Sequence, residues 1–177
     1  LDFDGTDDNV DAGNDASLDI TDEITVSAWF YQETQNEHKG IVSKWGAADV
    51  TRSWYLLTIL DAGESYIRMI VKDTVDVQYT VQNPLPISIN TWYHVVGVYN
   101  GSDIVLYVNG TEVDSVSAGA SLDSVSSSVV IGALGNLPAS NTAFEFDGLI
   151  DEVKIYNYAL TAEQIKTEYN GGAVNFR

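Results

Sequence analysis

The chain has 177 residues, of which 45% are hydrophobic, no cysteine, and 26 acidic against 8 basic residues, a formal net charge of -18 at pH 7. This length predicts one domain that buries roughly 70% of its unfolded surface, and the absence of cysteine excludes disulfides and cysteine-ligated metal centres. The charge disfavours nucleic acids, anionic membranes and strongly acidic polysaccharides as partners, and no apolar run reaches the ~20 residues of a membrane helix.

Short strands separated by turns are predicted through the first half of the chain. The segment 24–33, ITVSAWFYQE, alternates in polarity and is rich in β-branched and aromatic residues, which suit a pleated, half-buried surface. Similar runs predict strands at 40–45, 54–60, 66–73 and 76–82.

The second half adds a predicted three-stranded meander over residues 91–115. Its strands are interrupted by two Asn-Gly pairs, which favour the positive φ angles of tight hairpin turns. The same pairs begin Asn-x-Ser/Thr glycosylation sequons, but hairpin turns explain them better. With further strands at 128–134 and 146–157, the pattern predicts an all-β fold, a two-sheet antiparallel β-sandwich of the jelly-roll type.

One short C-terminal helix is predicted within LTAEQIKTEYNGG. Thr161 and Gln164 have the spacing of a capping box, and Leu160 and Ile165 can form the hydrophobic staple around it. The glycine pair at 171–172 is predicted to end the helix. We expect this helix to cover one edge of the sandwich.

The strand before that helix contains an acid in an unexpected place. Strict alternation puts Asp151 on the same side as Leu149, Val153 and Ile155, which are expected to be buried. A buried ionised carboxylate is costly unless it is paired or binds a metal. The sequence therefore predicts a partner for Asp151.

Six motifs in order give the chain a resemblance to the laminin-G-like, concanavalin A-like jelly-roll domains. They are LDFDGTDDNVDAG, ITVSAWFY, GIVSKW, TWYHVVGVYNGSDIVLYVNG, VVIGA and FDGLIDEVKIYNYALTAEQI, and together they span essentially the whole chain. The resemblance implies one domain over residues 1–177, two curved sheets, and chain ends that lie side by side. This fold carries lectins, adhesion modules and glycosidases, so it does not fix a function.

The resemblance also implies a structural calcium ion between the two chain ends. The clustered acids there would repel each other if they were brought together without a cation, and calcium takes ~6–8 oxygen ligands. The alternative is that Asp151 caps backbone amides and Asp4 closes a turn, with no metal. The ligands that the resemblance assigns are the side chains of Asp4 and Asp151 and the carbonyl of Gly5, with Asp7, Asp8, Asn9 and Asp147 in reserve.

No catalytic signature is present. The Glu-x-Asp-x-x-Glu pattern of glycosidases on this architecture is absent, as is the Gly-x-Ser-x-Gly nucleophile elbow. His38 is expected in a loop and His94 in a framework strand, both with structural roles. We therefore predict that the domain is not an enzyme.

Aromatic and polar side chains suggest where a sugar would bind. Tyrosine and tryptophan rings can stack on sugar rings, while arginine, asparagine, glutamine and aspartate bind hydroxyl groups. One candidate is the polar insertion between two tryptophans, and the other is the concave sheet. The candidate ligand contacts are Trp45, Trp54, Arg52 and Asp49 at the insertion and Tyr66, Arg68 and Tyr79 on the sheet, where Lys72 and Gln78 are also expected to face outwards.

These patterns favour a calcium-stabilised, non-catalytic carbohydrate-binding module, monomeric and part of a larger extracellular or cell-surface protein. A first residue other than methionine fits an excised domain. Two alternatives stay open: a protein-adhesion or structural spacer module, and a divergent glycosidase or polysaccharide lyase.

Overall fold

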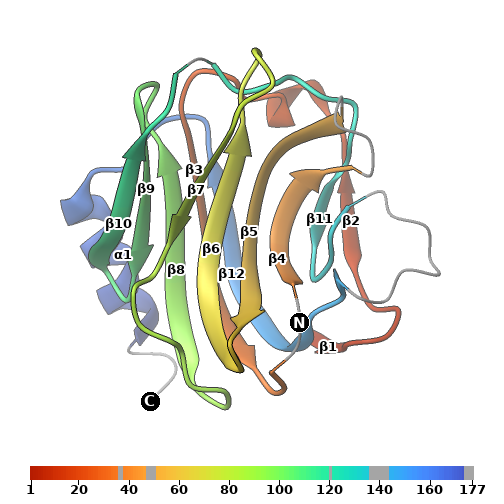
Figure 1. Cartoon of the computed structure of the whole chain (residues 1–177). Coiled ribbons are helices and arrows are strands. Elements are labelled where there is room, and N and C mark those ends of the chain that lie inside the picture. Colours follow the sequence, from red (N-terminus) through yellow and green to blue (C-terminus); the bar gives the residue numbers. More distant parts are fainter. Residues whose placement is uncertain (36–37, 47–50, 120, 136–143, 174–177) are drawn as a thin grey trace.

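The computed structural model of the chain describes residues 1–35, 38–46, 51–119, 121–135 and 144–173. Two six-stranded antiparallel sheets are packed face to face, and one α-helix lies outside them (Figure 1). The predicted all-β sandwich with a C-terminal helix is confirmed. Within the described ranges, no helix is long and apolar enough to cross a membrane.

Sheet A carries both the first and the last strand of the chain. Five of its six strands come from the predicted runs, and β1 pairs with the last of them. In spatial order its strands are β1 (Asp2–Asp4), β12 (Asp147–Tyr156), β3 (Ile24–Gln32), β8 (Trp92–Tyr99), β9 (Asp103–Val108) and β10 (Thr111–Ser117).

Sheet B lies in front of sheet A in Figure 1 and contains the predicted central strands. A short 3-10 turn, η1 (Ala16–Leu18), connects its first strand to sheet A. In spatial order its strands are β2 (Val10–Gly13), β11 (Val129–Ile131), β4 (Lys39–Trp45), β5 (Arg52–Asp61), β6 (Glu64–Lys72) and β7 (Gln78–Gln82).

The predicted meander is formed by β8, β9 and β10, which are neighbours in sheet A. The turn between β9 and β10 consists of Asn109 and Gly110, with φ angles of 50° and 73°. Positive φ at both positions is what a tight two-residue hairpin requires. The interpretation of this Asn-Gly pair as a turn is confirmed.

The helix α1 (Ala162–Ala173) begins at the predicted capping box. The amide of Thr161 donates to Gln164 Oε1 at 2.8 Å, and the amide of Gln164 donates to Thr161 Oγ1 at 3.3 Å. Leu160 and Ile165 are buried against Val96, on the outer face of sheet A. Two expectations were therefore wrong: the helix covers a face rather than an edge, and it continues past the glycine pair.

Candidate functional site

The strand β6 presents Tyr66 and Arg68 on the outer face of sheet B. Ile67, Met69 and Val71 alternate with them, point into the core, and are fully buried. Tyr66 and Arg68 are half-buried on the opposite side. The expectation that both face outwards is confirmed, while their role in binding stays a prediction.

Arg68 is held in place by Gln82 on the neighbouring strand β7. The two residues are opposite each other in the strand register. Nε and Nη2 of Arg68 donate to Oε1 of Gln82 at 3.0 and 2.6 Å. Burial lowers the pKa of Arg68, and the negative charge of Asp61 opposes this shift. Sequence reasoning missed Gln82, because only the register of β6 with β7 brings it to Arg68.

Leu57 and Ile59 of β5, which we call the apolar floor, lie beside Arg68 and Tyr66 on sheet B. In the strand register Leu57 is opposite Arg68, and Ile59 is opposite Tyr66. Both belong to a hydrophobic cluster separate from the main core, against which Tyr66 and Ile70 also pack. The buried members of this outer cluster are Trp45, Tyr55, Leu57 and Ile59, none more than 6% exposed.

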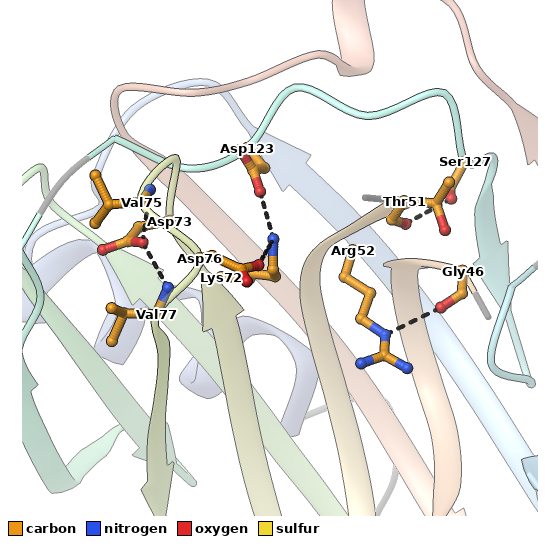
Figure 2. A network of polar contacts seen from close by, with 10 residues as sticks. All are labelled: Gly46, Thr51, Arg52, Lys72, Asp73, Val75, Asp76, Val77, Asp123 and Ser127. Atoms are coloured by element: carbon orange, nitrogen blue, oxygen red, sulfur yellow. Dashed lines mark hydrogen bonds and ion pairs between the residues drawn. The ribbon is translucent and has the colours of Figure 1, made fainter. Parts of the chain in front are cut away.

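Arg52 lies over the ring of Trp45 at the end of this cluster. Its guanidinium carbon is 5.5 Å from the ring centroid, and its Nε donates to the carbonyl of Gly46 at 3.3 Å (Figure 2). Trp45 is 6% exposed, so its ring is covered rather than presented as a platform. Trp54 is fully buried in the main core, which contradicts its prediction as a ligand contact. The fourth candidate of this group, Asp49, lies outside the described residues.

At the same end of sheet B, Lys72 takes part in a network of polar contacts (Figure 2). Its ammonium group lies 2.8 Å from a carboxylate oxygen of Asp123 and 2.7 Å from one of Asp76. Hydrogen bonds to these two acids raise the pKa of Lys72. The carboxylate of Asp73 accepts hydrogen bonds from two backbone amides of the turn between β6 and β7. Lys72 therefore stabilises loops instead of facing a ligand.

Tyr79 was predicted on the open face and is not there. It lies two positions before buried Val81 and therefore on the same face of β7, and its ring packs against the main core. Its hydroxyl donates to Asp73 Oδ2 at 3.0 Å. The prediction was wrong by one position of the β7 strand, because a shift of one residue moves a side chain to the other face.

The two chain ends meet in sheet A, as the resemblance implies. β1 pairs with the start of β12, and Asp4 is opposite Asp147. Asp4 Oδ1 accepts from the amide of Thr6 at 2.9 Å, and Asp8 Oδ2 accepts from the amide of Asp4 at 3.2 Å. Asn9 is exposed. Gly5, which follows Asp4, has a φ of 76°.

A buried lysine lies among these acids. Lys39 is 6% exposed; burial lowers its pKa, and the negative charges of Asp147 and Glu145 oppose that shift. Burial is also the main reason why the pKa of Glu145 is raised, with repulsion from Asp7 next. Oε2 of Glu145 is buried without a hydrogen-bond partner. Lys39 thus supplies positive charge here, and no three acidic or histidine side chains of the described ranges are grouped to hold a metal ion.

Asp151 lies away from this acidic end. It is four positions beyond Asp147 on β12, about 13 Å at ~3.3 Å per residue, and is opposite Trp29 of β3. Asp151 and Asp4 therefore cannot share one ion. The assignment of Asp151 to a calcium site with Asp4 is contradicted by the strand register.

Asp151 is also not buried, because β12 contains a β-bulge. The register of β12 with β3 shifts between Asp151 and Lys154, and Glu152 has a φ of 48°. An extra residue in a strand moves the following side chains to the other face. Ile150 faces the core before the bulge and Val153 packs against the core after it, so Asp151 is exposed. Strict alternation through residue 155 was the wrong assumption.

The described residues contain one serine–histidine pair that must be tested as catalytic machinery. Ser27 Oγ and His94 Nε2 are 3.1 Å apart, but both residues are 1% exposed beneath α1. Nδ1 of His94 has no hydrogen-bond partner, and burial lowers the pKa of His94 to about 4. A catalytic histidine is oriented by an acid and lies within reach of substrate. This pair has neither property, so it is structural.

Comparison with known families and structures agrees with the observed architecture. The sequence pattern described as the Concanavalin A-like lectin/glucanases superfamily matches residues 4–166. Comparison with curated protein sequences gives no match. The structural similarities below all lie under 25% sequence identity, so they concern the fold alone.

The solved structures that are similar to this chain include two sugar-bound domains and the binding domain of a mosquitocidal protein. The CBM40 of the Ruminococcus gnavus IT-sialidase, bound to α2,3 sialyllactose, has 14% identity and a TM-score of 0.75, covering 96% of this chain and 95% of that one. Domain 4 of AbnA, an extracellular arabinanase from Geobacillus stearothermophilus, is in complex with arabinotriose; it has 21% identity and a TM-score of 0.64, covering 85% and 68%. The binding domain of Paraclostridial Mosquitocidal Protein 1 has 19% identity and a TM-score of 0.73, and this chain, 96% of which is covered, spans 42% of it.

Proposed function

This chain belongs to the concanavalin A-like lectin/glucanase superfamily, and from that premise we propose that it is a non-catalytic carbohydrate-binding module of a larger extracellular protein. The observation that carries the proposal is the outer face of sheet B, where Tyr66, Arg68 and Gln82 lie beside the apolar floor of β5. Two similar structures, of a CBM40 and of an arabinanase domain, contain bound oligosaccharides and support this assignment.

The chemistry of this face suits a sugar. The C–H faces of a pyranose ring are apolar and can stack on the half-buried ring of Tyr66. Sugar hydroxyls need hydrogen-bond donors and acceptors that are already oriented, and the Arg68–Gln82 pair provides both. Sheet A offers less room, because α1 covers part of its outer face.

We expect Tyr66→Ala to weaken binding of the best ligand found on a glycan array by about twofold to tenfold. Stacking of an aromatic ring contributes ~0.5–1.5 kcal/mol, and 1.4 kcal/mol corresponds to tenfold in affinity. The measurement is titration calorimetry with the purified domain. Tyr158→Ala is the matched control, because Tyr158 is 45% exposed and lies in a separate cleft of about 450 Å³ beside α1.

Equal losses of affinity in Tyr66→Ala and Tyr158→Ala would show that the sugar does not bind on the outer face of sheet B. If the wild-type domain bound no neutral or acidic glycan, the result would instead favour the protein-adhesion alternative. Release of reducing sugar from mixed polysaccharides would favour the glycosidase alternative, and we expect none.

A calcium ion at the chain ends is retained in the proposal as a stabilising cofactor. We assign to it Asp4 and Asp147, which are opposite each other in the strand register, and the carbonyl of Gly5, while Asp151 is no longer included. Because few side chains converge there, backbone carbonyls and waters would have to supply most of the ~6–8 ligands.

Removal of calcium by EDTA is expected to lower the melting temperature by about 5–10 °C. An ion present at 100 times its dissociation constant contributes ~2.7 kcal/mol, and each 1 kcal/mol shifts the melting temperature of a domain this size by ~2–4 °C. The measurement is a thermal melt with EDTA and again with excess calcium. An unchanged melt would leave Lys39 as the cation that balances these acids.

A further inference from the structure

The charge of Arg68 is balanced differently from that of three lysines of the domain. Lys44, Lys72 and Lys154 each have a carboxylate oxygen within 3.1 Å. Among the described residues, Arg68 has no carboxylate within 4 Å, and its hydrogen-bond partner is the neutral amide of Gln82. A cation that is half-buried beside aliphatic side chains, with no ion pair and only the more distant charge of Asp61 to offset its burial, is costly for the folded domain.

The guanidinium group of Arg68 is held so that part of it remains available. Arginine has five N–H donors in a planar fork, and Gln82 accepts from Nε and from one hydrogen of Nη2. Three donors, two of them on Nη1, have no partner among the described residues. A planar pair of N–H donors matches the two oxygens of a carboxylate, and such charge-assisted, bidentate pairs are about twice as strong as neutral hydrogen bonds.

Resting on the proposed function, we infer that the sugar bound on sheet B is an acidic one, a uronic or sialic acid residue whose carboxylate pairs with Arg68 while its ring contacts Tyr66. The apolar floor of Leu57 and Ile59 strengthens this pair, because low local polarity increases the attraction between opposite charges. Gln82 acts as a positioning residue that fixes the fork.

The negative charge of the domain limits this ligand to few carboxylates. With a net charge of -18, the protein repels a polyanionic chain along its whole length. A single carboxylate in contact with Arg68 is different, because the other charges are screened beyond ~8 Å at physiological ionic strength. The prediction that strongly acidic polysaccharides are disfavoured is therefore compatible with recognition of a sugar that carries one carboxylate.

The test compares acidic oligosaccharides with matched neutral ones by titration calorimetry. The probes are sialyllactose against lactose, and a galacturonic acid disaccharide against its methyl ester, which separate the two sources of the carboxylate. We expect at least one acid to bind about tenfold to a hundredfold more tightly than its neutral partner, and Arg68→Gln to abolish that difference. Arg68→Lys keeps the charge without the fork and should retain only part of it.

Two controls keep the test decisive. Melting temperatures check that the Arg68 variants fold, and Lys166→Gln, which removes one positive charge from an exposed position of α1, should leave the preference intact. Tighter binding of neutral sugars, or a preference for acids that survives Arg68→Gln, would overturn the inference while leaving the carbohydrate-binding function in place. No binding of any sugar to the wild-type domain would overturn both.

Discussion

Gly148→Ala is expected to destabilise the domain by about 2–6 kcal/mol. Gly148 lies in β12 between β1 and β3, with a φ of 131°, a backbone conformation that L side chains rarely adopt. An added Cβ would lie 2.0 Å from the backbone carbonyl oxygen of Tyr31. Strain of this kind costs ~1–3 kcal/mol and overpacking a further ~1–3 kcal/mol. Since the clash is with backbone, β12 must separate from β3 to relieve it.

Gly63→Ala is the matched control for this substitution. Gly63 also has a positive φ, of 87°, but no atom lies within 4 Å of its added Cβ. The stability lost in Gly63→Ala should therefore reflect backbone strain alone, about 1 kcal/mol. Urea unfolding of both variants measures the difference. Equal losses at the two positions would show that the contact with Tyr31 does not restrain β12.

Acidification is expected to remove about 3 kcal/mol of stability through His94. Its ring is 1% exposed between Trp29 and Tyr169, at centroid distances of 5.2 and 6.1 Å. Burial lowers the pKa of His94 from 6.5 to about 4, an effect that Glu168 opposes. The unfolded chain therefore binds a proton at a higher pH than the folded domain. Stability is fully present above pH 6.5 and is lost as the pH falls towards 4.

The His94→Phe variant isolates this contribution from that of the carboxylates. We expect the free energy of unfolding of the variant to change less between pH 7 and pH 4 than that of the wild-type domain, by about 3 kcal/mol. Titrating acids such as Glu145 affect both proteins alike, so they cancel in the difference. His38→Gln, at an exposed histidine, should retain the wild-type profile. Parallel profiles for wild type and His94→Phe would contradict the assignment.

The sequence predicts the architecture well because its signals are local. Polarity alternation locates the strands, Asn109-Gly110 locates a hairpin turn, and Thr161 with Gln164 locates the helix start. Each of these features is decided by neighbouring residues. The order of motifs then places the chain ends side by side, and the pairing of β1 with β12 agrees.

The site was less predictable because it depends on registers between strands. Gln82 was missed since only pairing of β6 with β7 puts it at Arg68. Trp54 shares the inward face of β5 with Leu56, whereas Tyr55 and Leu57 belong to the outer cluster, so both faces of β5 are apolar and alternation does not tell them apart. The assignment of Asp151 failed because of the β12 bulge. Aromatic composition alone could not distinguish these faces.

The pairing of β1 with β12 has a consequence for how the domain folds. Phe3 meets Gly148, so this contact closes nearly the whole polypeptide into a ring. Closing so long a segment costs about 4 kcal/mol of chain entropy by the logarithmic dependence on length, whereas β8, β9 and β10 join through short turns. The meander can therefore assemble early, and docking of the first strand is a late event that completes sheet A.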